Sequence, residues 1–93
     1  MLVIRNLFTA KPGMASKLAK QLYGAWNKHG FRVYTDSVGD MNTVVLEHEA
    51  KDLAEVEALF KRYGTDAEIK KSMEGYTDLY LTGRREVLQT YKP

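Results

Sequence analysis

The order of predicted elements constrains this chain more than any single residue does. A strand-favouring run over residues 2–9 ends at Pro12 and Gly13, which punctuate the backbone. From residue 14 to about 29, apolar side chains recur at helical spacing, and Gly30 stands where a left-handed residue commonly ends a helix. We therefore expect a first strand over 2–9, followed by a first helix over 14–29.

The next pattern predicts a hairpin. Two strand-like runs, 31–38 and 41–49, flank Gly39-Asp40, a two-residue connection that suits a type II′ turn. Counting outward from this turn gives one aliphatic face, which should meet the helices, and one mixed face. The predicted pairs are Val38 with Met41, Asp36 with Thr43, Tyr34 with Val45 and Arg32 with Glu47 on the mixed face, and Thr35 with Val44, Val33 with Leu46 and Phe31 with His48 on the aliphatic face.

A second helical stretch has its own start signals. Asp52 followed by Glu55 is a capping-box variant, and a helical stripe of apolar residues then runs to Gly64. Thr65 with Glu68 repeats the box, which predicts a shorter helix directly after the first.

The C-terminal region predicts two further strands. Residues 76–82 read as a fourth strand, and Gly83 is expected to bend or bulge the chain. Residues 86–91 have enough Val, Leu and Tyr for a terminal strand that is available to a partner's sheet. We therefore treat 84–93 as a terminal strand or tail that contacts a partner subunit.

Composition excludes several classes of protein. The 93 residues, 44% of them hydrophobic, suit one domain, and the absence of Cys excludes disulfides, thiol nucleophiles and thiolate metal sites. No apolar run approaches the roughly 20 residues that span a bilayer, and the start of the chain lacks the layout of a signal peptide. The net charge of +2 is interspersed, without a basic tract. We expect a cytoplasmic protein with no membrane or nucleic-acid partner and no bound metal.

The strand–helix–strand–strand–helix–strand order predicts an α+β fold of the ferredoxin-like βαββαβ type over residues 1–93, with helices on one face of an antiparallel sheet. A domain of this size is marginally stable alone. The uncovered face would expose a large apolar patch, so we expect a second copy to cover it, giving a homodimeric barrel. The residues assigned to that patch are Ile4, Leu7, Tyr34, Val45 and Tyr80.

At this point the chain resembles the dimeric α/β-barrel superfamily, particularly small domains similar to antibiotic biosynthesis monooxygenases and heme-degrading monooxygenases. The resemblance rests on the element order, on residues 9–13 (TAKPG) before an amphipathic helix, and on residues 52–55 (DLAE) at the start of the second helix. Asn6 falls where heme-degrading members carry an Asn that reaches the pocket. The Trp and His of their triad have no counterpart, since Trp26 lies on the first helix and His48 on the third strand. Heme degradation is therefore not expected.

The resemblance implies a cofactor-independent monooxygenase-type enzyme, in which the bound substrate itself activates dioxygen. Its substrate would be a small hydrophobic or aromatic molecule held in the barrel of the homodimer. The same barrel hosts isomerases, decarboxylases and simple binding proteins, so a non-catalytic dimer that binds a small ligand or a partner remains the alternative. A third reading is an interaction module that uses the terminal strand as an edge. The sequence leaves open whether the chain is an enzyme at all.

The candidate catalytic residues lie on the mixed face of the hairpin. Arg32, Tyr34 and Glu47 project together there, and Arg5 and Tyr80 are expected to join them from neighbouring strands as substrate-binding groups. Such groups can bind a carboxylate or phenolate and move protons. The alternative is a cross-strand ion pair with aromatic packing, which is an ordinary stabiliser of sheets.

Three further candidates carry two readings each. His48 is either a catalytic base or a partly buried histidine near the sheet edge. Trp26 either lines the substrate site or packs in the core as part of the helical stripe. Asn6 and Arg5 are adjacent in a strand, so only one can face the barrel; the resemblance favours Asn6, the polarity of the hairpin favours Arg5, and both are retained as substrate-binding candidates.

Overall fold

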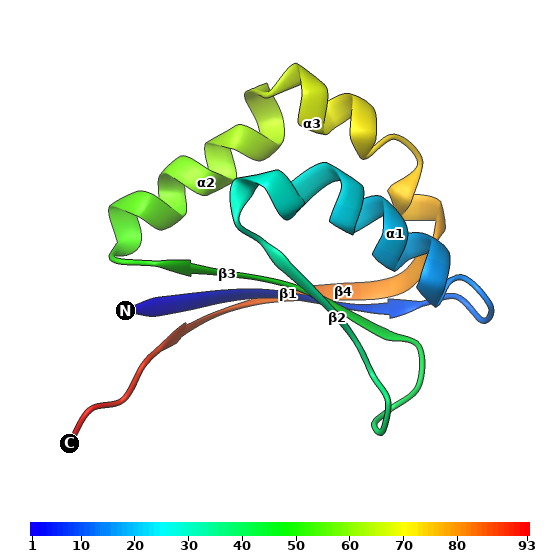
Figure 1. The fold of residues 1–93 in the computed structure, drawn as a ribbon, viewed down its shortest axis with the longest axis horizontal. Helices are drawn as coiled ribbons and strands as arrows, with labels where there is room; N and C mark the ends of the chain where they lie inside the picture. Colours follow the sequence, from blue (N-terminus) through cyan, green and yellow to red (C-terminus); the bar gives the residue numbers. More distant parts are fainter.

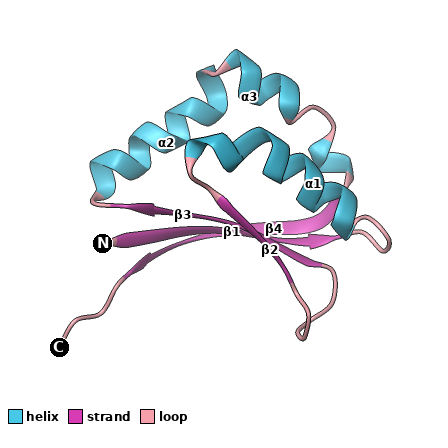
Figure 2. Ribbon diagram, in the orientation of Figure 1, coloured by secondary structure: helices cyan, strands magenta, loops and turns pink.

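All the helices lie on one side of a four-stranded sheet in the computed structural model, which describes residues 1–93 (Figure 1). The elements are β1 (Leu2–Ala10), α1 (Ala15–Trp26), β2 (Arg32–Thr35), β3 (Thr43–Ala50), α2 (Leu53–Thr65), α3 (Ala67–Ser72) and β4 (Tyr80–Gln89), with 3₁₀ turns at Asn27–His29 and Tyr76–Asp78. The strand order is β2-β3-β1-β4, and every neighbouring pair is antiparallel. The predicted α+β, ferredoxin-like fold is confirmed, and Figure 2 shows its two layers, helices over strands.

Alternation along β1 assigns each residue to one of two faces. Ile4 and Asn6 are buried under the helices, at 2% and 5% exposed, whereas Arg5 and Leu7 point to the uncovered side. Ile4 therefore belongs to the core and not to the uncovered patch, which corrects that part of the prediction. The predicted hairpin register is confirmed from Arg32 opposite Glu47 to Thr35 opposite Val44. The core under the helices is apolar and includes Leu18, Leu22 and Trp26 from α1, Val44 and Leu46 from β3, and Val56 and Leu59 from α2.

The two predicted helix caps have different outcomes. The Asp52 carboxylate accepts a hydrogen bond from the Glu55 amide at 2.9 Å, as predicted. The second capping box is predicted one residue too early. Thr65 is still helical, and its hydroxyl donates to the Lys61 carbonyl one turn earlier. Asp66, which has an extended backbone, caps α3 instead by accepting from two backbone amides, including that of Glu68.

The loop between β2 and β3, residues 36–42, is longer than the predicted two-residue turn at 39–40. Strand pairing stops at Thr35 because the carboxylate of Asp36 accepts the Thr43 amide at 3.2 Å, and this side-chain bond replaces further ladder pairing. Two residues near the end of the loop have positive φ, Met41 at 68° and Asn42 at 58°.

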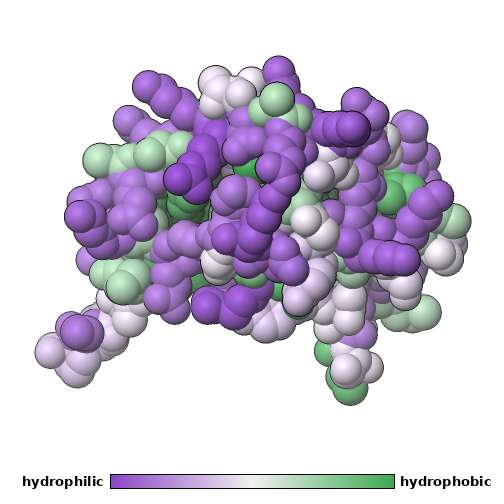
Figure 3. Space-filling model, turned by 45° about the horizontal axis from the view of Figure 1, so that its top comes forward, coloured by the Kyte–Doolittle hydropathy of each residue, from purple (hydrophilic) through white to green (hydrophobic).

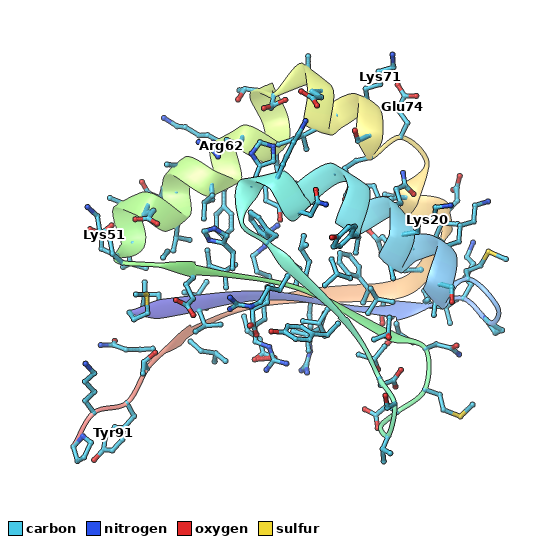
Figure 4. The ribbon with its side chains drawn as sticks, viewed as in Figure 1. Lys20, Lys51, Arg62, Lys71, Glu74 and Tyr91 are labelled. Carbon is cyan, nitrogen blue, oxygen red and sulfur yellow. The ribbon has the colours of Figure 1, made fainter.

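The predicted fourth and terminal strands are one continuous strand. β4 pairs with β1 of the same chain along its whole length, since β1 offers a full-length ladder partner, and residues 76–78 form a 3₁₀ turn. The irregularity in pairing falls opposite the end of β1, between Thr9 and Ala10, and Gly83 lies within the regular ladder. The tail beyond Gln89 and the loop between β2 and β3 both project to the uncovered side of the sheet (Figure 1). Contact of this tail with a partner stays a prediction; Tyr91, labelled in Figure 4, lies far from the sheet and is 84% exposed.

No helix of the structure combines the length and apolarity that crossing a membrane requires.

Candidate functional site

A cavity of about 270 Å³ lies between the helix-covered face of the sheet and the segment that leads from α2 through α3 into β4. The helix-bearing face of the molecule is largely hydrophilic at its surface, with apolar side chains visible between polar ones (Figure 3). Seven of the eleven residues that line the cavity are hydrophobic, three of them tyrosines that also carry a hydroxyl group. The polar residues in its lining are Asn6, Tyr63, Tyr76, Tyr80, Arg84 and Arg85.

Asn6 is the one buried polar residue of the structure, and its amide is held from both ends. Arg85 donates through Nε to Asn6 Oδ1 at 2.7 Å, and Asn6 Nδ2 donates to the Tyr63 hydroxyl oxygen at 3.3 Å. Because a guanidinium can only donate, this pairing fixes which end of the amide is the oxygen. The Tyr63 oxygen accepts in this network, so its own O–H is left available to a ligand.

The Arg85 guanidinium is also stacked on aromatic rings. Its central carbon lies 4.2 Å from the ring centre of Phe60 and 5.5 Å from that of Tyr63, which is cation–π geometry. Arg85 forms no ion pair. The three other arginines on strands, Arg5, Arg32 and Arg84, each pair with a glutamate.

Two of the phenols that line the cavity, Tyr63 and Tyr76, keep their protons at neutral pH. Burial raises the pKa of Tyr63 to about 12, although the nearby Arg85 guanidinium and the hydrogen bond from Asn6 act in the opposite direction. Burial also raises the pKa of Tyr76, and the neighbouring Tyr80 raises it further. These hydroxyls are therefore hydrogen-bond donors to anything that enters, and not bases.

Gly83 makes room for one wall of the cavity. A Cβ at this position would stand 3.1 Å from Cδ1 of Phe8, a tight contact that would require the ring to shift by a few tenths of an ångström. The Phe8 ring in turn packs against Tyr80, with ring centres 5.0 Å apart. The glycine thus allows the close approach of an aromatic ring to β4, rather than the predicted bend.

The predicted mixed-face group is brought together on the other side of the sheet. Arg32 Nη2 and the Tyr34 hydroxyl lie 3.0 and 3.1 Å from Glu47 Oε1, and Arg5 Nε lies 3.5 Å from Glu47 Oε2. The hydrogen bond to Glu47 raises the pKa of Arg32. None of these four side chains lines the cavity, whereas Tyr80, predicted to join them, does so with Asn6. The geometry is that of a cross-strand ion network, and a catalytic role for it stays a prediction.

His48 and Trp26 take part in aromatic packing. The His48 ring lies 4.5 Å from that of Phe31, and its Nδ1 is buried without a hydrogen-bond partner. Trp26 is fully buried and stacks on Tyr63 with ring centres 4.3 Å apart, so it supports a cavity residue without lining the cavity. No three His, Asp or Glu side chains are grouped closely enough to hold a metal ion.

Sequence reasoning missed Tyr63, Tyr76 and Arg85. Tyr63 belongs to the apolar stripe of α2, where a tyrosine resembles any core residue. Arg85 was separated from its partner because the sequence predicted a bend or bulge at Gly83 between two strands, 76–82 and 86–91. A continuous β4 would have paired Arg85 with Asn6 directly, since the two are opposite each other in the ladder.

Comparison with known proteins supports the fold. No family model matches the sequence, and no curated protein matches it. The chain is similar in structure to an uncharacterised NIPSNAP domain protein from Burkholderia xenovorans, with a TM-score of 0.79, 18% identity, and 98% of this chain and 95% of that one covered. It is also similar to a NIPSNAP family protein from Agrobacterium tumefaciens, with a TM-score of 0.82, 9% identity, and 97% and 92% coverage.

A third similar structure is an antibiotic biosynthesis monooxygenase, with a TM-score of 0.72, 12% identity, and 99% of this chain and all of that one covered. The predicted resemblance to small domains of this kind is therefore confirmed at the level of the fold. At such low identities the likeness establishes the fold alone.

Proposed function

We propose that this chain is a cofactor-independent monooxygenase-type enzyme that oxidises a small aromatic or enolic molecule in the cavity between sheet and helices. The observation that carries the proposal is a cavity lined by apolar and aromatic side chains together with convergent hydrogen-bond donors, a combination that is usual in small-molecule sites. The fold shared with an antibiotic biosynthesis monooxygenase supports the same reaction type. Of the residues predicted from sequence, Asn6 and Tyr80 belong to this proposed site.

The reaction would use the substrate as its own electron source. An enolate or phenolate reacts with dioxygen at an activated CH₂ carbon, whose two C–H bonds break. That carbon supplies four electrons, one oxygen atom stays on it as a carbonyl, and the other leaves as water. The Tyr63 hydroxyl, positioned by Asn6, would donate a hydrogen bond to the oxygen that carries the negative charge.

The cavity lining restricts which substrates can react. None of its residues carries a carboxylate or an imidazole, so it contains no general base with a pKa near neutrality. The substrate proton would therefore pass to water, which favours molecules whose enol or phenol is already acidic. The positive charge of Arg85 would stabilise the resulting anion.

The proposed enzyme is a homodimer in which two uncovered sheet faces meet. Arg32, Glu47, Arg5 and Glu86 form a row of alternating charge across all four strands. A neighbouring row contains Tyr34, 44% exposed, with Val45 and Leu7. Val45 is already 6% exposed, so a second copy would remove chiefly Tyr34 and Leu7 from water while keeping the charges paired. A reducing compartment such as the cytoplasm suits a chain without cysteine.

Oxygen uptake tests the proposed reaction. We expect the purified protein, in buffer with a metal chelator, to consume dioxygen with an acidic anthrone, whose activated CH₂ carbon the reaction requires. Tyr63→Phe should lower kcat/KM by roughly 100-fold, the effect typical of losing one oxyanion donor. Tyr23→Phe is the matched control, because Tyr23 lies on α1 at 57% exposed. Equal rates for the two variants would contradict the proposed role of Tyr63.

A second function is favoured by the lack of a base in the cavity: a non-catalytic dimer that binds a small aromatic ligand. Both functions require binding in the cavity, and only the enzyme requires turnover. Saturable binding of the same anthrone without oxygen uptake would support the binding protein over the monooxygenase.

A further inference from the structure

Arg85 is held in place while most of its hydrogen-bonding capacity is unused. A guanidinium has five N–H donors, and the structure uses the one on Nε, which bonds Asn6 at 2.7 Å. The stack on Phe60 fixes the plane of the group. The two terminal nitrogens keep their four N–H groups, arranged as the fork that binds a carboxylate through two parallel hydrogen bonds.

The other arginines on strands have acidic partners within the chain. Arg5 and Arg32 share Glu47, and Arg84 pairs with Glu86. On the helix-covered side no carboxylate lines the cavity next to Arg85. Arg85 is thus the strand arginine whose acidic partner is missing from the chain itself.

The rest of the cavity favours the same kind of ligand. The side chains of Asn6, Tyr63 and Tyr76 add amide and phenol groups, with Tyr63 and Tyr76 protonated at neutral pH, and nothing in the lining carries a negative charge. A cavity of 270 Å³ is slightly below the range of roughly 300–1,000 Å³ usual for ligand pockets, so it suits a small, compact ligand.

We propose that Arg85 determines the specificity of this cavity and that the ligand is a small aromatic or enolic carboxylate, bound through the free fork of the guanidinium. This inference rests on the proposed function, because it assigns the charge of the molecule that the proposed site accepts. The ring occupies the aromatic part of the cavity, and the carboxylate supplies the partner that Arg85 lacks.

The experiment compares two probes of nearly equal shape by isothermal titration calorimetry, benzoate and its neutral amide, benzamide. Benzoate should bind wild-type protein about tenfold or more tightly than benzamide, which corresponds to one charge-assisted interaction. Arg85→Gln should remove this preference by weakening benzoate alone. Arg85→Lys should restore only part of it, since an ammonium keeps the charge but lacks the planar fork.

Arg62→Gln is the matched control. Arg62, labelled in Figure 4, lies on α2, forms no ion pair and does not line the cavity. This variant should keep the full preference for benzoate, which shows that the preference does not arise from net charge. If Arg85→Gln fails to fold, the probe ratio in wild type and in Arg85→Lys still decides the question.

The outcomes separate this inference from the proposed function. Equal binding of benzoate and benzamide to wild type, or an unchanged preference in Arg85→Gln, overturns the role of Arg85 and leaves the cavity as a ligand site. Failure of both probes to bind overturns the inference and the ligand site together. A benzoate preference that depends on Arg85 supports the inference even if no anthrone is oxidised.

Discussion

The two faces of the sheet use arginine in opposite ways. On the uncovered face, Arg32 and Arg5 share Glu47, so charges are matched within the chain. On the helix-covered face, Arg85 is matched by an amide and an aromatic ring but by no carboxylate. Both arrangements come from neighbouring strands of one sheet. The difference indicates that the paired charges of the uncovered face stabilise the sheet. The guanidinium of Arg85, which is held in place without an acidic partner, is available to a ligand.

The faces also differ in how they are buried. Helices cover one side of the sheet with apolar side chains, and no part of the chain covers the other side (Figure 2). Substitutions on the two sides should therefore differ in how much they lower the stability of the protein.

The largest expected effect is that of Leu46→Ala on the helix-covered face. Leu46 is 1% exposed, so the change leaves a cavity in the core and should lower the free energy of unfolding by about 3 kcal/mol. Leu7 lies on the uncovered side and is half-buried. Leu7→Ala should therefore lower the free energy of unfolding by about 1 kcal/mol when measured on dilute protein. Urea denaturation of both variants checks this, and equal losses would contradict the assignment of the faces.

The next effect appears at alkaline pH and depends on Tyr63. Its pKa is about 12 in the folded protein against an ordinary 10.0, so below pH 10 its proton is bound in both states and stability is unaffected. As pH rises from 10 to 12 the unfolded chain loses this proton first. The free energy of unfolding should then fall by about 2 kcal/mol.

Spectroscopic titration of phenolate absorbance measures this directly. The wild-type protein should show a late-titrating step near pH 12 that Tyr63→Phe removes and that Tyr23→Phe retains. The alkaline loss of stability should be smaller in Tyr63→Phe. A wild-type titration without the late step would show that Tyr63 is not buried as described.

A smaller effect is expected for Gly83→Ala in the cavity wall. The new methyl group would meet Phe8 at 3.1 Å, so the ring must move and unfolding should become easier by about 1.5 kcal/mol. Gly64→Ala is the control, because its helical position has open space around it and alanine should stabilise it by about 0.5–1 kcal/mol. Thermal denaturation of the pair should give shifts of opposite sign; stabilisation by both would contradict the close packing at Gly83.

The smallest expected effect is that of Glu47→Gln on the uncovered face. Removing the shared carboxylate leaves Arg5 and Arg32 as like charges on adjacent strands, so Tm should fall slightly at low ionic strength. High salt should reduce the difference because it screens the repulsion between the two arginines, whose side chains are 36% and 48% exposed. Glu57→Gln on α2, which breaks no ion pair, should leave Tm unchanged. An equal fall in Tm at high salt would show that the effect does not arise from repulsion between Arg5 and Arg32.

Local patterns in the sequence predicted much of the fold. Alternation identified the two faces of the hairpin, and the cap at Asp52 identified the start of α2. The predictions were wrong where contacts with residues elsewhere in the chain determine the local structure. Gly83 is predicted to bend or bulge the chain because glycine often marks such points in a strand, but pairing with β1 continues β4 through it. Asp36 ended the ladder early through a side-chain bond that alternation cannot show.

The candidate site was harder to predict, because it depends on contacts between residues far apart in the chain. Asn6 and Arg85 are separated by 79 residues, and Asn6 and Tyr63 by 57. Arg32, Tyr34 and Glu47 were found because a short hairpin brings them together. The local charge network could therefore be predicted from the sequence, whereas the cavity on the opposite face could not.

The central claim is that a ligand binds on the helix-covered side of the sheet, and the amide NMR spectrum of the protein titrated with benzoate tests it most directly. We expect the largest shifts at the cavity residues Asn6, Gly83 and Tyr76, and no shift at Arg32 to Thr35 on the β2 edge. Shifts concentrated in β2 and around Glu47, with the cavity amides unchanged, would contradict the claim and place the site on the uncovered face.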